Sequence, residues 1–229
     1  MLKLKQDYKI LTTKQTSSNQ KVFLRQFKED FYHMGAILPS SSALGRAGSA
    51  YLANKQGPVR VLEAGAGAGS FTREIIPLLE PGDVLDTVEI NPDLIVYLKQ
   101  QFATNPDFQP RPGVDINLIN ADIRSIASGE YDYIVFSLPL TNFPPEMVQE
   151  ILELMIARLK PGGVFSFVKY IFVSRFKYWF GGEATQLEMT TNQNIIAGFA
   201  DQYQIDQRAV LMNVPPTWVY YWQKPISNE

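Results

Sequence analysis

The sequence predicts an α/β protein built on a doubly wound sheet whose last strand runs antiparallel, preceded by N-terminal helices. Three observations predict this fold class. Short aliphatic runs alternate with amphipathic segments from residue 59 to residue 169, as in parallel sheets with crossover helices. A turn with three glycines follows the first of these runs. Two further strands, joined at Pro215-Pro216, are expected to close the sheet as an antiparallel edge pair.

The individual elements follow from their composition and their boundaries. Each strand is a β-branched or aliphatic run, and several start after proline–glycine turns, such as those at residues 56–58 and 81–83. Helices start at capping residues, as at Asn91-Pro92. Helices are predicted at residues 43–54, 71–79, 91–102 and 145–159, and strands at residues 59–62, 84–90, 116–119, 131–136, 164–169, 208–214 and 218–222.

Composition indicates one domain, residues 55–229, preceded by an extension of residues 1–54. The chain has 229 residues, and 45% of them are hydrophobic, which is enough for a full core. It contains no cysteine, and His33 is its only histidine, so disulfides are excluded and a metal site is not expected. No apolar run reaches membrane-spanning length and no signal-peptide core is present, so we expect a cytoplasmic protein.

The N-terminal extension is basic and aromatic. Residues 1–28 carry seven lysines and arginines against Asp7 alone, although the formal charge of the whole chain is −2. Residues 1–18 are predicted to be a loose arm, and residues 19–34 an amphipathic helix. The helix has an aromatic face with cations beside it, formed by Phe23, Phe27, Phe31, Arg25 and Lys28. Such a helix can lie in a bilayer interface or pack on its own domain; the basic arm favours an anionic membrane, while the net charge argues against nucleic acid.

The first strand and the glycine turn after it are the centre of the predicted site. Gly65, Gly67 and Gly69 can adopt backbone angles that other residues avoid, and they let a ligand approach the backbone. The helix that follows offers free N–H groups at its N-terminus. Glu63 precedes the turn. A carboxylate there would repel a pyrophosphate but attract the amino group and sulfonium of S-adenosylmethionine, so this cofactor is predicted.

Two acids and the residues after them complete the predicted cofactor site. Glu89 ends the second strand, twenty positions past Gly69, where an acid accepts hydrogen bonds from ribose hydroxyls, and Ile90 follows it. Asp122 follows the third strand and can accept a hydrogen bond from an adenine amino group. Ile123 can cover the adenine ring.

The loop after the fourth strand is the predicted substrate side. Its first three residues, Ser137, Leu138 and Pro139, are predicted catalytic residues, and Ser137 is also a predicted cofactor-binding residue. Proline in a stiff apolar loop fixes main-chain carbonyls in place, which suits holding an amine near a methyl group. Residues 170–182 gather aromatic side chains around Arg175 and Lys177, and they predict either a second membrane-interface patch or a core helix.

These motifs resemble those of known enzymes. Class I S-adenosylmethionine methyltransferases are similar at residues 63–72, 88–92, 120–122 and 159–163. The soluble bacterial phospholipid N-methyltransferases are similar at residues 23–24, 33–41, 137–140 and 213–220. The resemblance implies a Rossmann-like methyltransferase sheet, S-adenosylmethionine as cofactor and a membrane-binding N-terminal helix. It also implies N-methylation of phosphatidylethanolamine towards phosphatidylcholine, although an ornithine lipid stays open as the substrate.

The substrate side carries no evident histidine or carboxylate base. Tyr32 and the Ser137 region are therefore expected to hold the amine, with water or a tyrosine taking its proton. The nearest rival is the rRNA adenine dimethylase group, which shares the acidic glycine loop. That group has Asn-Leu-Pro-Tyr or a close variant after the fourth strand and a separate basic helical domain; here the stretch is Ser-Leu-Pro-Leu and that domain is missing. A second rival is a non-catalytic lipid-binding protein that retains the fold.

Overall fold

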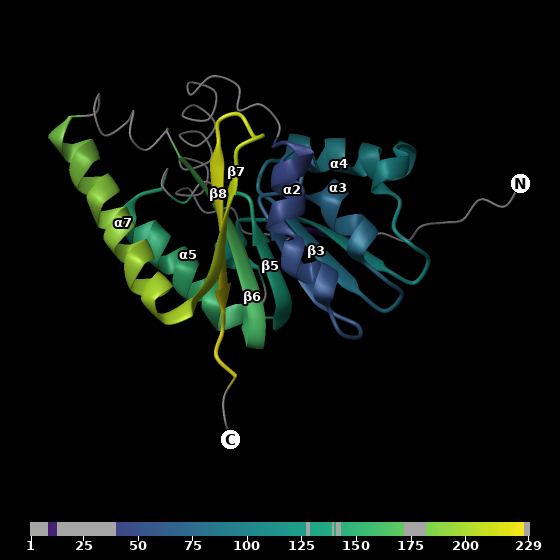
Figure 1. Cartoon of the computed structure of the whole chain (residues 1–229). Coiled ribbons are helices and arrows are strands. Elements are labelled where there is room, and N and C mark those ends of the chain that lie inside the picture. The colour runs from purple at the N-terminus through teal and green to yellow at the C-terminus, as the bar shows by residue number, and fades with distance from the viewer. Residues whose placement is uncertain are drawn as a thin grey trace, which may run out of the picture.

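The computed structural model describes residues 9–12, 40–126, 129–138, 140, 143–171 and 182–226. Their centre is an eight-stranded sheet of order β1-β4-β3-β2-β5-β6-β8-β7 (Figure 1). In chain order the strands are β1 (Lys9–Thr12), β2 (Arg60–Ala64), β3 (Val84–Glu89), β4 (Asp115–Asn120), β5 (Tyr131–Phe136), β6 (Leu159–Tyr170), β7 (Gln204–Val210) and β8 (Thr217–Gln223).

Strand directions confirm the predicted fold class. Strands β1 to β6 pair in parallel, whereas β8 lies between β6 and β7 and pairs antiparallel with both. Strand β7 therefore runs in the same direction as β1 to β6, and the last strand alone is reversed. The carboxyl ends of β1 to β7 meet at one edge of the sheet, which we call the carboxyl edge. In open α/β sheets this edge binds ligands.

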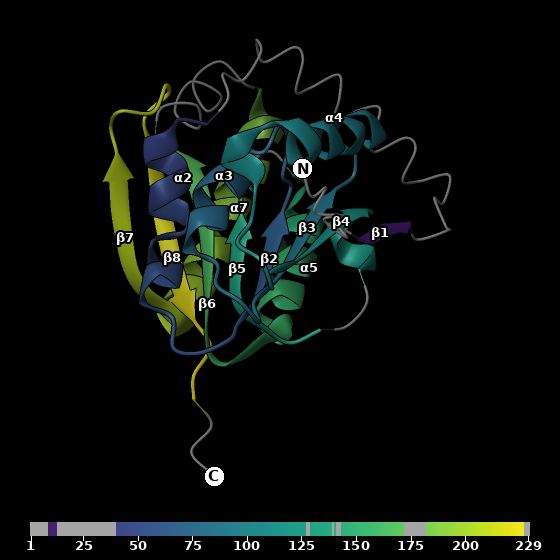
Figure 2. The same ribbon diagram turned by 90° about the vertical axis from the view of Figure 1, so that its right-hand side faces the viewer.

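Helices cover both faces of the sheet (Figures 1 and 2). One face carries α2 (Ser42–Gly48), α3 (Thr72–Ile75) and α4 (Pro92–Thr104), and the other carries α5 (Pro145–Arg158) and α7 (Glu183–Tyr203). The described part of the chain also contains four short 3₁₀ segments, η1 (Ala50–Asn54), η2 (Ile76–Leu78), η3 (Pro106–Phe108) and η4 (Ile123–Ser125). Each face has its own core, with Leu44, Phe71 and Leu98 in the first and Phe136, Phe165 and Trp222 in the second.

The loose arm predicted for residues 1–18 is wrong at Lys9–Thr12. These four residues form β1 and pair with residues 117–120 of β4. Strand β4 would otherwise present unpaired backbone groups at the edge of the sheet, and a short added strand satisfies them. The rest of that arm, and the predicted helix at residues 19–34, lie outside the described residues. The predicted domain boundary after residue 54 stays a prediction, although α2 already packs on the sheet.

The predicted elements also need correction in three places. The helix predicted at residues 43–54 is α2 followed by the 3₁₀ segment η1, with the change at Ser49. Helix α7 was not predicted, because most of its residues are polar and, among those whose burial is described, only Met189, Asn192 and Ile196 are buried. Strand β7 follows α7 directly and spans Gln204–Val210, four residues earlier at both ends than the predicted strand at residues 208–214.

Candidate functional site

The glycine turn between β2 and α3 lies at the carboxyl edge and has the predicted strained backbone. Gly65, Gly67 and Gly69 have φ of 79°, 57° and 84°, which disfavours any residue with a side chain. A Cβ at Gly65 would lie 2.4 Å from the Leu138 side chain, and one at Gly69 would lie 2.6 Å from Phe108. A Cβ at Gly67 would meet nothing within 4 Å. Two glycines therefore allow tight packing, and the middle one borders open space.

Glu63 lies beneath this turn and has no exposed surface. Both of its carboxylate oxygens accept a hydrogen bond from Thr72 Oγ1 at 2.8 Å, and Oε2 also accepts from Thr87 Oγ1 at 3.1 Å. Burial raises the pKa of Glu63 to about 7, against the opposing effect of these hydroxyls. Because the Glu63 carboxylate is fully buried, it is not accessible for the predicted direct contact with a cofactor amino group. Instead the side chain joins β2, β3 and the start of α3.

Glu89 lies at the end of β3 and faces the glycine turn. Its Oε2 accepts a hydrogen bond from Gly67 N at 2.9 Å, and its Oε1 accepts from Asn91 N at 2.8 Å. Burial raises the pKa of this carboxyl, and the N–H donors oppose the shift. Asn120 supports the strand end by donating to the carbonyls of Glu89 and Ile90 at 2.9 and 3.1 Å. The predicted ribose acceptor is thus held beside the open space at Gly67.

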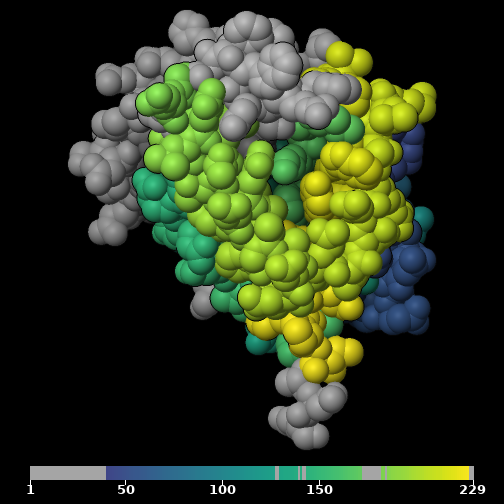
Figure 3. All heavy atoms as spheres, turned by 60° about the vertical axis from the view of Figure 1, so that its left-hand side comes forward, coloured from purple at the N-terminus to yellow at the C-terminus, as the bar shows by residue number. Residues whose placement is uncertain are grey.

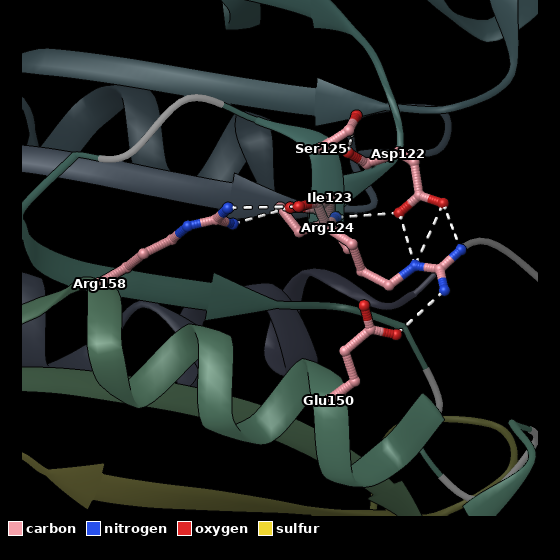
Figure 4. A network of polar contacts seen from close by, with 6 residues as sticks. All are labelled: Asp122, Ile123, Arg124, Ser125, Glu150 and Arg158. Carbon is pink, nitrogen blue, oxygen red and sulfur yellow. Dashed lines mark hydrogen bonds and ion pairs between the residues drawn. The ribbon is translucent and has the colours of Figure 1, made fainter. Parts of the chain in front are cut away.

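Asp122 begins the loop after β4 and is bound by an arginine (Figure 4). Its Oδ1 accepts hydrogen bonds from Arg124 N at 2.9 Å and Arg124 Nε at 3.1 Å, and its Oδ2 lies 2.7 Å from Arg124 Nη2. Arg124 Nη1 also pairs with Glu150 of α5 at 3.1 Å. This planar, two-point contact fixes the Asp122 carboxylate, which is almost fully buried. The predicted adenine acceptor therefore has a cationic neighbour that sequence reasoning missed.

The η4 segment is held from the other side by Arg158, at the end of α5 (Figure 4). Arg158 Nη1 donates to the carbonyl of Ile123 at 2.8 Å, and Nη2 donates to the carbonyl of Ile126 at 2.8 Å. Burial lowers the pKa of Arg158. Ile123, predicted to cover the adenine ring, is buried and has its backbone fixed by this arginine. A basic residue in the last turn of a helix is common, so this role of Arg158 could not be predicted from its position in the sequence.

The residues that follow β5 are hydrogen-bonded to the glycine turn. Ser137 N donates to the carbonyl of Ala64 at 3.1 Å, and Ser137 Oγ donates to the carbonyls of Ala64, at 3.2 Å, and Gly65. Leu138 lies against Gly65. Two of the predicted substrate-side residues therefore contact the predicted cofactor loop.

The other predicted substrate and membrane residues lie outside the described residues. They are Tyr32, Pro139, Phe23, Phe27, Phe31, Arg25, Lys28, Arg175 and Lys177. Within the described ranges, no group of three histidine, aspartate or glutamate residues could hold a metal ion. None of the helices in that part of the chain is long and apolar enough to cross a membrane.

The assembled site fits an adenosyl ligand. Open space borders Gly67, and the carboxylates of Glu89 and Asp122 lie at the ends of the two neighbouring strands. A ribose offers hydroxyl donors and an adenine offers an amino donor, so acceptors at these two positions match that ligand. The turn itself is built of glycine and alanine, which leaves the backbone accessible.

Comparisons with known proteins agree with this geometry. Residues 62–165 match the family described as a methyltransferase domain. An ornithine lipid N-methyltransferase from Singulisphaera acidiphila is 26% identical over 145 residues, which are 63% of this chain and 74% of that relative. A ribosomal RNA small subunit methyltransferase A from Pseudomonas syringae is 42% identical over 71 residues, but the match covers only 29% of this chain and 25% of that relative.

Solved structures agree on the fold. The N-methyltransferase NodS from Bradyrhizobium japonicum, crystallised with S-adenosyl-L-homocysteine, superposes with a TM-score of 0.55. The superposition covers 91% of this chain and all of that one at 15% identity. The family match at residues 62–165 and the shared fold together support a methyltransferase domain with S-adenosylmethionine as its cofactor.

Proposed function

We propose that the protein methylates the amine of a lipid headgroup, either phosphatidylethanolamine towards phosphatidylcholine or an ornithine lipid. The observation that carries this proposal is the chemistry at the exit of β5. Ser137 uses its hydroxyl to bind the carbonyls of Ala64 and Gly65, and Leu138 packs on Gly65. The described residues at this exit are Ser137, Leu138, Leu140 and Phe143, and none of these four carries an amide that could read the edge of a nucleobase. Such a site suits a small alkylamine.

The cofactor roles are part of the proposal. Glu89 would bind the ribose hydroxyls, since it is the acid beside the open space at Gly67. Asp122 would accept from the adenine amino group, and Ile123 and Ile90 would cover the ring and the sugar. Glu63 would act from beneath the loop, by fixing Thr72 and Thr87. When bound, S-adenosylmethionine supplies a methyl group already activated on a sulfonium sulfur.

The protein's own task is to present a neutral amine. A primary alkylamine has a pKa of roughly 10, so at neutral pH it carries a proton that has to leave before the nitrogen can attack. Transfer of the amine into a site lined by Leu138 disfavours the charged form and lowers its pKa. Main-chain carbonyls near Ser137, together with Tyr32 as proposed from the sequence, would orient the nitrogen. Water or a tyrosine would take the proton.

Within the described ranges from residue 40 onward, the contacts of the basic side chains favour a lipid over RNA. Among residues 40–126, 129–138, 140, 143–171 and 182–226, eight of the twelve lysines and arginines form ion pairs with carboxylates. Two more, Arg158 and Lys224, donate to main-chain carbonyls. A nucleic-acid surface needs cations free to neutralise phosphates. The larger match to a lipid N-methyltransferase, 63% of the chain against 29% for the rRNA enzyme, supports the same choice.

The test presents both acceptors to one preparation. Pure protein is incubated with methyl-labelled S-adenosylmethionine and either vesicles containing phosphatidylethanolamine or ornithine lipid, or unmodified ribosomal RNA. Label in a lipid supports the proposal, and the lipid that is labelled identifies the headgroup. Label in RNA alone overturns it. Cofactor binding without transfer to any acceptor would favour the non-catalytic alternative.

The proposed membrane partner has its own test. If the basic N-terminal segment and the residues Arg175 and Lys177 bind anionic lipid, co-sedimentation with vesicles should rise with anionic lipid content and fall with salt. Binding that ignores both, or that survives deletion of residues 1–34, would contradict a role for the basic helix.

A further inference from the structure

The turn between β7 and β8 exposes a cluster of apolar side chains at the carboxyl edge. Strand β7 runs parallel to β1 to β6, so the turn that follows it lies at the same edge as the glycine turn (Figure 1). Leu211, Met212 and Val214 have exposed fractions of 72%, 84% and 67%. We call these three residues the hairpin tip. In the space-filling view the C-terminal hairpin, in yellow, reaches the upper rim of the molecule (Figure 3).

The backbone of this turn is fixed although its apolar side chains are exposed. Asn213 is only 3% exposed, and its Oδ1 accepts a hydrogen bond from Ser41 N, at the N-terminus of α2, at 2.9 Å. Its Nδ2 donates to the carbonyl of Pro215 at 2.9 Å and to Thr217 Oγ1 at 3.1 Å. The carbonyl of Pro216 accepts from Ile171 N at 2.9 Å. One buried amide thus anchors the turn between two apolar side chains that point away from the core.

The hairpin tip is apolar, whereas the residues below it on β6 and β8 are amphipathic. No charged residue occurs from Leu211 to Thr217. At the next level Lys169, at the end of β6, lies opposite the half-buried Trp218 of β8. No carboxylate of the described residues pairs with Lys169, and burial lowers its pKa. Tryptophan and lysine below an apolar tip are the arrangement found at the headgroup level of membrane-inserted surfaces.

We propose that the hairpin tip inserts into the lipid bilayer and turns the carboxyl edge towards the membrane, an inference that rests on the proposed lipid substrate. A lipid bilayer can bury an isolated apolar tip without a complementary surface. Removal of the apolar side chains from water then stabilises the membrane-bound state. A protein partner suits the tip less well, because three side chains on a narrow turn cannot supply the roughly 800 Å² that each partner buries in a stable interface. Insertion here would bring the headgroups level with Ser137 and the glycine turn.

A site-specific label tests insertion directly. The chain has no cysteine, so Met212→Cys carries a single environment-sensitive fluorophore. Ile226→Cys is the matched control, because Ile226 is 71% exposed and follows β8 at the opposite edge of the sheet. With vesicles of phosphatidylethanolamine and an anionic lipid, the label at residue 212 should shift to the blue and become shielded from an aqueous quencher. The label at residue 226 should change in neither respect. No shift at residue 212 on vesicles that co-sediment with the protein overturns the proposal.

A second variant separates this inference from the proposed function. Leu211→Ser/Met212→Ser should weaken vesicle binding at least tenfold and reduce methyl transfer to vesicle lipid by a similar factor. Transfer to a monomeric short-chain lipid with the same headgroup, and affinity for S-adenosylhomocysteine, should stay unchanged; Ile226→Ser should change none of these. Equal vesicle binding by the variant and the wild type overturns the hairpin role while leaving lipid methylation intact. If the wild type methylates no lipid in either form, the proposed function fails, and the label shift alone decides whether the tip inserts.

Discussion

The buried carboxyl of Glu63 predicts how stability depends on pH. Its pKa is about 7 in the folded protein, against an ordinary value of 4.5 for an exposed glutamate. Between these two values the folded state keeps a proton that the unfolded state has released, so stability falls as pH rises through this range. Each tenfold change in proton affinity is worth about 1.4 kcal/mol, and the whole shift therefore corresponds to about 3 kcal/mol. The penalty is absent below pH 4.5 and complete above pH 7.

Glu63→Gln removes the titrating group while keeping its shape. The amide still bonds to the hydroxyls of Thr72 and Thr87, which can donate or accept. We expect the wild type to lose about 3 kcal/mol of unfolding free energy between pH 5 and pH 8, relative to the variant. Unfolding in urea, followed by circular dichroism at pH 5, 6, 7 and 8, measures both curves.

An exposed carboxylate provides the control for the Glu63 experiment. Glu146→Gln changes an exposed carboxylate on α5 and should leave the pH slope as in the wild type. If Glu63→Gln shows that same slope, then Glu63 does not hold a proton at neutral pH in the folded state. Burial would then not raise the pKa of Glu63 in the folded protein.

Three further predictions concern the site. Glu89→Ala should weaken binding of S-adenosylhomocysteine by about 1–3 kcal/mol in calorimetry, as expected for a lost charged hydrogen-bond partner; an unchanged Kd would refute the ribose role. Arg158→Met should leave two buried carbonyls of the η4 loop without donors and lower the unfolding free energy in urea by about 2–4 kcal/mol, and a loss below 1 kcal/mol would contradict this. Gly65→Ala should unfold at lower urea than Gly67→Ala, because its Cβ would clash with Leu138, whereas Gly67→Ala should mainly weaken cofactor binding. Equal midpoints for the two alanine variants would argue against that contact.

Most of the sheet could be predicted from the sequence because its strands carry a strong local signal. The apolar runs of β2 to β6 are bounded by glycine and proline turns, and the predicted strands match the observed ones closely, apart from an earlier start of β6. The glycine turn was also predictable, since the spacing of Gly65, Gly67 and Gly69 reflects a backbone requirement that is now seen as positive φ. These features depend on neighbours along the chain.

The missed features depend on contacts between segments far apart in sequence. Arg158 supports the loop at Ile123 across thirty-five positions, and Thr87 reaches Glu63 across twenty-four. No periodic pattern marks such partners, and an arginine or threonine at these positions has many ordinary roles. Strand β1 was missed for a related reason, because four residues acquire strand structure only when β4 is present to pair with them.

One hydroxyl links the two halves of the site. Ser137 Oγ binds the backbone of the glycine turn, so the loop that would receive the acceptor is tied to the loop that would receive the methyl donor. We expect a change in the backbone of either loop to alter the position of the other loop through these hydrogen bonds. We therefore expect a cofactor bound at the glycine turn to position the acceptor loop, which would favour ordered binding, in which the cofactor enters first and its demethylated product leaves last.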